Sequence, residues 1–339
     1  MDSSKIIDEK ILLNYTSDSS IAERVRGLIA QQKESWNLVQ KNYNDFNRIK
    51  TKTFEFEQFK IVVQFNPGRL VSSSAMVDVK SIDNRPCFLC IESLPQEQRG
   101  LIYKNEYLIL VNPFPIFREH FTIPTLKHQP QEIANSFSNM LDLGKELGKY
   151  YSVFYNGPKC GASAPDHLHF QACTKKVLPI ETELDEIVSD KGELLYEHVN
   201  TAVYGLSNYL RNFFLIQTDK KESAIIQFKN LQTISKRSSD TSDEPMMNII
   251  VLYDEVWKIF VFPRAKHRPT QYFLEGNDRI LVSPAAADFG GQLIIPREED
   301  FYKITKENVE NIFAQTSISK NIFEKISSNY SALARKYEG

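Results

Sequence analysis

The sequence lacks the features that mark membrane, secreted and nucleic-acid-binding proteins. Its longest apolar runs, such as Tyr107–Val111, are far shorter than the roughly 20 residues needed to span a bilayer. Its first residues, Met1–Lys5, do not form the basic and then apolar segments of a secretory signal. Lys and Arg (41) nearly balance Asp and Glu (43), so the net charge of −2 provides no general attraction to nucleic acid. We therefore expect a cytoplasmic protein without a membrane or nucleic-acid partner.

Cysteine is also scarce, and four cysteines in 339 residues do not make a disulfide framework. The hydrophobic content of 42% and the aromatic content of 12% are those of an ordinary globular protein. The length allows two domains, or one large domain with an internal duplication.

The most informative segment runs from Asp166 to Ala172 and reads Asp-His-Leu-His-Phe-Gln-Ala. Side chains in a β-strand alternate between its two faces. His167, His169 and Gln171 therefore share one face, while the apolar residues between them can enter a core. Two imidazoles and an amide on one face are the pattern of a catalytic strand.

The ten residues before this strand, Asn156–Pro165, form a loop rich in small residues. Such a loop lets backbone N–H groups approach an anion closely. Two histidines on one face could also be a hydrogen-bonded polar patch, or metal ligands alone. Because Gln171 is in phase with them and the loop precedes them, we favour a histidine that attacks a phosphate.

The order of predicted elements indicates an α+β fold, an antiparallel sheet with flanking helices. Strands are expected at Tyr107–Val111, Phe121–Ile123, Ser152–Asn156 and His167–Thr174, with a helix within Gln131–Tyr150. This β-β-α-β-β unit is expected to be duplicated, with further strands in the second half. Those second-half strands are expected at Asn248–Tyr253, Trp257–Pro263, Arg279–Ser283 and Gly291–Pro296.

These elements divide the chain into three predicted regions. Residues 1–80 form an N-terminal region of helix and strands, with an amphipathic helix over about Ile21–Phe46. Residues 81–235 form the catalytic half, and residues 245–339 form a second, degenerate half that ends in a helix. The second half contains no His-x-His motif.

Cys87 and Cys90 have the C-x-x-C spacing at which two thiolates bind one zinc ion. The pair alone could also be a redox couple or two packed core residues. His128 and His167 are the candidates for two further ligands. Four protein ligands leave no open position, so the metal would be structural. His120 is assigned a structural role.

These motifs resemble the transferase branch of the histidine-triad superfamily. That branch includes galactose-1-phosphate uridylyltransferase, diadenosine tetraphosphate phosphorylase and the GDP-hexose phosphorylases. The string Gly161–Ala172 is most similar to the GDP-hexose phosphorylases, although Asp166 stands where the relatives usually have Asn. Cys87, Cys90, His128 and His167 correspond to the structural zinc ligands of uridylyltransferases, so structural zinc, or iron, is implied. No organic cofactor is implied.

The resemblance implies a two-step transfer through a nucleotidyl-histidine at His169. The substrate would be a nucleoside diphosphate sugar or a dinucleotide, and phosphate or a sugar phosphate would be the acceptor. Gln171 would bind a phosphate oxygen without acting as a general acid. The residues assigned to phosphate or ribose are Asn156, Gly157, Lys159, Gly161 and Ser163.

Three alternatives to a nucleotide-sugar phosphorylase are left open. The chain could be a dinucleoside polyphosphate phosphorylase, a nucleotide hydrolase, or an inactive nucleotide-binding protein. The presence of both His169 and Gln171 argues against the last of these. The sequence leaves the nucleobase, the acceptor and the oligomeric state open, a homodimer included.

Overall fold

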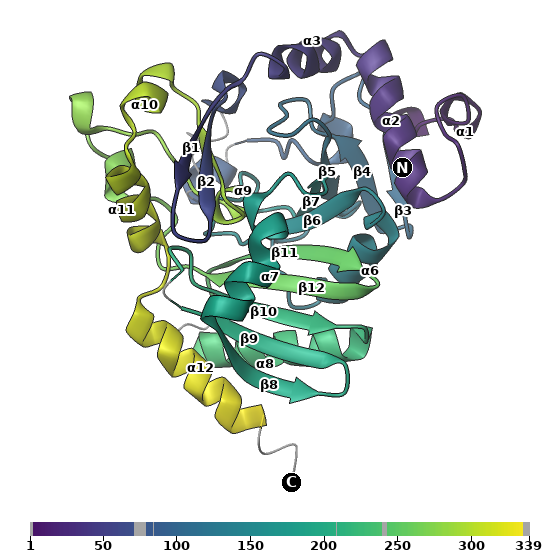
Figure 1. Ribbon diagram of the computed structural model, residues 1–339. Coiled ribbons are helices and arrows are strands. Elements are labelled where there is room, and N and C mark those ends of the chain that lie inside the picture. Colours follow the sequence, from purple (N-terminus) through teal and green to yellow (C-terminus); the bar gives the residue numbers. More distant parts are fainter. Residues whose placement is uncertain (1–2, 71–78, 84, 208, 239–242, 335–339) are drawn as a thin grey trace.

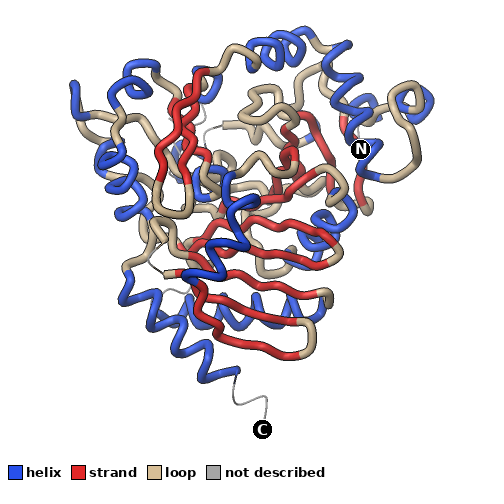
Figure 2. Tube along the Cα trace, viewed as in Figure 1, coloured by secondary structure: helices blue, strands red, loops and turns tan. Residues whose placement is uncertain are grey.

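The computed structural model describes residues 3–70, 79–83, 85–207, 209–238 and 243–334 (Figures 1 and 2). Helices and mostly antiparallel strands make up these residues, which confirms the predicted α+β class. None of the helices described is both long and apolar enough to cross a bilayer.

The centre of the molecule is a ten-stranded sheet. Its first five strands along the chain are β3 (Gly100–Tyr103), β4 (Tyr107–Val111), β5 (His120–Pro124), β6 (Tyr151–Asn156) and β7 (His169–Thr174). The other five are β8 (Gly192–His198), β9 (Thr201–Leu206), β10 (Phe213–Thr218), β11 (Met247–Asp254) and β12 (Val256–Pro263). Their spatial order is β3-β4-β5-β7-β6-β11-β12-β10-β9-β8, and every neighbouring pair is antiparallel.

This strand order shows the predicted duplication. One helix, α6 (Phe137–Leu147), separates β5 from β6, and another, α8 (Lys221–Ser238), separates β10 from β11. The two halves therefore repeat the same series of three strands, a helix and two strands. They meet where β6 pairs with β11, with Val153 opposite Val251, and the strand order of one half mirrors that of the other.

The composition of the second unit differs from the sequence prediction. Arg279–Ser283 is not a strand, because the Asp300 carboxylate accepts the Leu281 N–H at 2.8 Å in place of a neighbouring strand. β13 (Gln292–Ile295) forms, but it pairs in parallel with β2 (Lys60–Phe65) in a separate three-stranded sheet. We therefore propose that the boundary between the halves lies between β7 and β8, earlier than the predicted residue 235.

The three-stranded sheet has the order β1-β2-β13 and begins with a hairpin. Its strands β1 (Lys50–Glu55) and β2 (Lys60–Phe65) pair antiparallel, with Phe54 opposite Ile61. Before it, the single helix expected over Ile21–Phe46 is two helices, α2 (Ile21–Ser35) and α3 (Asn37–Phe46). They separate at Trp36, which is buried in an extended conformation.

Two apolar cores lie on opposite faces of the large sheet. One core joins the sheet to α2, α6, α8 and α12 (Lys320–Ala334). The other joins it to the β1-β2-β13 sheet, α7 (Pro179–Lys191) and α9 (Ala286–Phe289). In Figure 1, α7 crosses in front of the strands and α8 lies behind them. The other α-helices among the described residues are α1 (Glu9–Leu12), α5 (Val79–Asp83), α10 (Glu298–Lys303) and α11 (Lys306–Thr316).

Candidate active site

His169 is the first residue of β7, and its side chain lies on the α9 side of the large sheet. The apolar residues Leu168, Phe170 and Ala172 pack into the opposite core beside α6. His169 and Gln171 therefore share the other face, as the alternation of the sequence predicts. His167 precedes β7 and its ring belongs to a different cluster, described below.

The ring of His169 is held by a backbone carbonyl group two residues earlier in the chain. Its Nδ1 lies 2.8 Å from the carbonyl oxygen of His167. A carbonyl oxygen only accepts, so the hydrogen is on Nδ1 and Nε2 carries a lone pair. Burial, with a smaller effect of the nearby His167, lowers the pKa of His169 to about 4. At neutral pH the ring is therefore neutral, the form in which imidazole is nucleophilic.

Gln131 holds the backbone on both sides of this histidine. β6 and β7 pair only from Tyr151 to Phe154 on the β6 side, so Asn156 and His169 lie beyond the ladder. The buried Gln131 side chain joins them: its Oε1 accepts the His169 N–H at 2.7 Å. Its Nε2 donates to the carbonyl oxygens of Asn156 (2.9 Å) and His169 (3.1 Å). Sequence reasoning missed Gln131, because one amide in a loop leaves no periodic pattern.

The small-residue loop is packed against the second half of the chain. The Oδ1 of Asn156 accepts from Asn248 Nδ2 at 2.9 Å and from the Ala286 N–H at 2.8 Å. The Asn156 amide nitrogen makes no hydrogen bond to the described part of the chain, so it is available to a ligand. Gly161 has a φ of 97°, and a Cβ there would lie 2.6 Å from the Ala285 Cβ. Glycine is needed at this position for both reasons.

The other predicted ligand-binding residues occupy varied positions. The Gly157 N–H donates to the Met247 carbonyl oxygen at 3.1 Å and so joins the small-residue loop to β11. Lys159 forms an exposed 2.9 Å ion pair with Asp243, and Ser163 is half-buried. Within the described residues, no hydrogen bond or ion pair links Lys159 or Ser163 to His169.

The Gln171 side chain makes one hydrogen bond to the part of the chain that the structure describes. Its Oε1 lies 2.9 Å from Nε2 of His120, on the neighbouring strand β5. Its Nε2 makes no hydrogen bond to the described part of the chain. The site thus presents the lone pair of His169 and the amide groups of Asn156 and Gln171 on adjacent strands.

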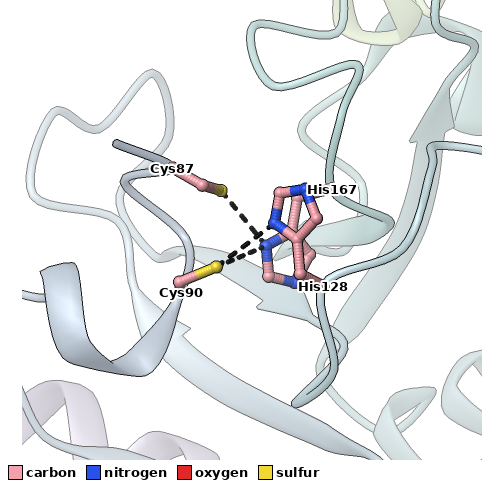
Figure 3. Close-up of side chains that lie close together, drawn as sticks. All are labelled: Cys87, Cys90, His128 and His167. Carbon is pink, nitrogen blue, oxygen red and sulfur yellow. Dashed lines mark hydrogen bonds between the residues drawn. The ribbon is translucent and has the colours of Figure 1, made fainter. Parts of the chain in front are cut away.

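A second cluster joins Cys87, Cys90, His128 and His167, as the sequence predicts (Figure 3). Their ligand atoms all lie within 4.8 Å of one another. Cys87 Sγ is 3.2 Å from His167 Nδ1, and Cys90 Sγ is 3.2 Å from His128 Nδ1. Two thiols and two imidazoles at these separations fit one tetrahedral zinc ion.

The surroundings of the cluster also fit a metal. Nε2 of His167 lies 2.8 Å from the Thr125 carbonyl oxygen, which directs Nδ1 toward the cysteines. A hydrogen bond of this kind on the second ring nitrogen is usual for metal-bound histidine. Asp166, next to His167, forms a 2.7 Å ion pair with Arg85, which lies two residues before Cys87. With four protein ligands, a bound metal would join the Cys87–Cys90 turn to the start of the catalytic strand.

Family models match both halves of the chain. Residues 28–174 match a domain of unknown function (DUF4922), and this segment contains His169, Gln171 and the Cys/His cluster. Residues 185–337 match the GDPGP1-like C-terminal domain. No curated protein sequence matches the chain.

Solved structures share the fold. Yeast Ap4A phosphorylase Apa2 in complex with AMP aligns with a TM-score of 0.54 and 18% identity, covering 86% of this chain and 96% of that one. Another structure of the same enzyme gives a TM-score of 0.53 and 18% identity, covering 83% of this chain and 94% of that one. Its complex with Ap4A gives a TM-score of 0.52 and 18% identity, covering 83% of this chain and 97% of that one.

At this identity the structural likeness establishes a shared fold. The predicted enzyme class, a nucleotidyltransferase or phosphorylase, agrees with that fold and with the matched domain. The chain therefore shares the fold of Ap4A phosphorylase Apa2, and its residues 185–337 match the GDPGP1-like C-terminal domain, in agreement with the resemblance read from the motifs.

Proposed function

We propose that this protein is a nucleotidyl phosphorylase that cleaves a nucleoside diphosphate sugar of the GDP-hexose type through a covalent intermediate on His169. The observation that carries the proposal is the hydrogen bond from His169 Nδ1 to the His167 carbonyl oxygen. It leaves the Nε2 lone pair directed away from the strand, on the face that also holds Gln171. The resemblance of Gly161–Ala172 to the GDP-hexose phosphorylases supports this substrate class, and the GDPGP1-like match of residues 185–337 agrees with a phosphorylase.

The reaction has two displacements at one phosphorus atom. First, His169 Nε2 attacks the α-phosphorus, a P–N bond forms, and the bond to the bridging oxygen breaks. Hexose 1-phosphate leaves with that electron pair. Then an oxygen of inorganic phosphate attacks the same phosphorus, the P–N bond breaks, and its electron pair returns to Nε2. The second product is the nucleoside diphosphate.

The chain's amides bind and orient the phosphate. The Gln171 and Asn156 NH2 groups donate to non-bridging oxygens, whose negative charge is greatest in the transition state. Neither amide can protonate a leaving group or deprotonate water at neutral pH. The intermediate is therefore kept for a phosphorylated acceptor. Gln131 keeps the His169 backbone in place during both displacements.

The Cys87/Cys90/His128/His167 cluster is proposed to hold a structural zinc ion. Bound there, the metal would supply cross-linking and no catalytic chemistry, because all four positions are taken by protein ligands. The cytoplasmic location and a homodimer stay predictions.

A second candidate is phosphorolysis of a dinucleoside polyphosphate. It is favoured by the fold shared with an enzyme that has been solved with AMP and with Ap4A. The same two displacements would then release a nucleoside triphosphate and afterwards a nucleoside diphosphate.

One experiment tests both candidates. The protein is incubated with α-labelled GDP-hexoses (GDP-glucose, GDP-mannose and GDP-L-galactose) and, separately, with labelled Ap4A. We expect an acid-labile adduct with a GDP-hexose, discharged by phosphate and absent in His169→Ala. Adduct formation with Ap4A but with none of the GDP-hexoses would select the second candidate. Turnover without any adduct would reject the covalent mechanism.

A further inference from the structure

The two ends of the Gln171 side chain have different partners. Its oxygen, Oε1, is 2.9 Å from Nε2 of His120. Its NH2 group makes no hydrogen bond within the described residues and is on a half-buried side chain that shares one face of β7 with His169. The contact with His120 therefore determines which end of the amide is presented to a ligand.

His120 is placed by the sheet register. It lies on β5 opposite Cys173, while Thr122 lies opposite Gln171. His120 and Gln171 are therefore diagonal neighbours on one face, a separation that long side chains can bridge. The carbonyl oxygen of His120 accepts from the Asn112 N–H at 2.8 Å and from the Tyr43 hydroxyl at 3.1 Å, which holds its backbone.

The ring of His120 cannot reach a ligand. Its exposed fraction is 0%, and Phe154 stacks on it with centroids 6.1 Å apart and an interplanar angle of 20°. Phe117 meets it edge-on, with centroids 5.6 Å apart. These two rings hold the imidazole in one orientation. Any effect of His120 on the reaction must therefore pass through Gln171.

The protonation state of the pair follows from the hydrogen-bonding chemistry. An amide oxygen only accepts, so the hydrogen lies on His120 Nε2 and Nδ1 is bare. Nδ1 is buried and has no partner among the described residues. If the Gln171 amide were flipped, its NH2 group would donate to His120 Nε2. The ring hydrogen would then lie on Nδ1, where it would be a buried N–H donor without an acceptor.

His120 also remains neutral across the physiological range. Burial, with a smaller effect of the positive charge of Arg69, lowers its pKa to about 3. The ring therefore carries one hydrogen, which is the one that Gln171 accepts.

We propose that His120 is a positioning residue for nucleotidyl transfer: by holding the Gln171 amide oxygen, it directs the Gln171 NH2 group toward the phosphate that His169 attacks. The inference rests on the proposed function. The torsion of the terminal amide of glutamine is broad and nearly two-fold. Without the contact to His120 the Gln171 amide would therefore rotate, and some of the protein molecules would present its oxygen to the phosphate. That oxygen would repel the charge that develops on the phosphate.

The test compares two replacements of His120 by single-turnover adduct formation, with the α-labelled GDP-hexoses and Ap4A as probes. His120→Leu removes the donor and keeps an apolar side chain. We expect it to slow adduct formation about 10- to 100-fold, the scale of one hydrogen bond to a charged group, with little change in apparent affinity. His120→Gln returns an N–H donor at a similar distance from the backbone and should recover most of the rate.

A double-mutant cycle separates positioning from a general structural effect. In a Gln171→Ala background, His120→Leu should have no further effect, because its only route to the phosphate is already removed. Thr122→Val, on the same face of β5, is the matched control and should leave the rate near wild type. A wild-type rate of adduct formation in His120→Leu would overturn the proposal. So would a loss of rate on adding His120→Leu to Gln171→Ala that equals the loss in the wild-type background.

A spectroscopic measurement applies even if His120→Leu does not fold. In wild-type protein with ¹⁵N-labelled histidine, one ring besides that of His167, whose Nε2 also donates to a carbonyl oxygen, should show a protonated Nε2 and a bare Nδ1 from about pH 5 to pH 8. That signal should be absent in His120→Gln, and its absence in wild type would overturn the proposal. If wild-type protein forms no adduct with any probe, the proposed function fails and this inference fails with it. If the adduct forms and His120→Leu has no effect, only this inference fails.

Discussion

The carbonyl oxygen of His167 accepts a hydrogen bond from Nδ1 of His169 at 2.8 Å. The ring of the same His167 lies in the Cys/His cluster, with Nδ1 3.2 Å from Cys87 Sγ. One residue thus contributes its backbone to the proposed nucleophile and its side chain to the proposed metal site. The stability of the cluster and the orientation of His169 are therefore expected to be coupled.

This coupling makes a prediction for the metal site. The purified protein should contain about one zinc or iron per chain, as a single four-ligand site requires. Cys87→Ser should lower metal content, thermal stability and the rate of adduct formation together. The buried Cys160 is outside the cluster, and Cys160→Ala should leave the metal content unchanged. Metal-free wild-type protein with full thermal stability would show that these cysteines are only packed.

Replacement of the proposed nucleophile should remove the chemistry and keep the fold. His169→Ala should reduce turnover by about 10³-fold or more, the scale seen when a nucleophile is lost. Adduct formation should fall below detection, while circular dichroism and thermal unfolding stay close to wild type. Turnover at the wild-type rate in His169→Ala would exclude the mechanism.

Gln131 should matter for both stability and rate. Gln131→Leu leaves the His169 N–H and two carbonyl groups without partners, at a cost of about 1–3 kcal/mol in the free energy of unfolding. It should also slow adduct formation, because the His169 backbone is no longer joined to Asn156. Denaturant unfolding and single-turnover assays measure the two effects. Gln129→Leu is the matched control, since Gln129 contributes only its backbone oxygen, to the Leu168 N–H.

Gln171 should decide whether the intermediate is transferred or hydrolysed. Gln171→Glu or Gln171→His introduces a group that can exchange protons with water or a leaving group. Either change should raise hydrolysis relative to transfer, measured as the ratio of nucleoside monophosphate to diphosphate at saturating phosphate. A wild-type protein that hydrolyses its substrate equally fast without an acceptor would be a hydrolase.

Two half-buried carboxyl groups predict the pH dependence of stability. Burial raises the pKa of Glu181 and of Glu244 from the ordinary 4.5 to about 7. The folded protein therefore binds these protons more tightly than the unfolded chain does. Their contribution is fully present below about pH 4.5 and is lost as the pH rises to about 7.

Urea unfolding at several pH values tests this sign. Glu181→Gln and Glu244→Gln should each flatten the fall in the free energy of unfolding between about pH 4.5 and 7. Glu186 is exposed on the same helix as Glu181, and Glu186→Gln should leave the slope unchanged. A slope unaffected by the first two variants would contradict the assignment.

The sequence alone determined the features that depend on local periodicity and chemistry. Alternation along Leu168–Ala172 predicted which side chains of β7 enter the core, and the structure agrees. The C-x-x-C spacing and the two histidines predicted the four-residue cluster, because ligand types and short spacings are visible in one dimension. The β-β-α-β-β order predicted the α+β class, although the repeated unit of the sheet has other bounds than the predicted one.

Only the tertiary structure decided which distant segments meet. It placed β8, β9 and β10 in the second unit and β13 in another sheet, because strand pairing depends on long-range packing that short apolar runs do not encode. It also brought Gln131 to His169 and His120 to Gln171, across 38 and 51 residues of chain. A single buried hydrogen bond between such positions leaves no period in the sequence, since its geometry exists only after both segments have taken their places in the fold.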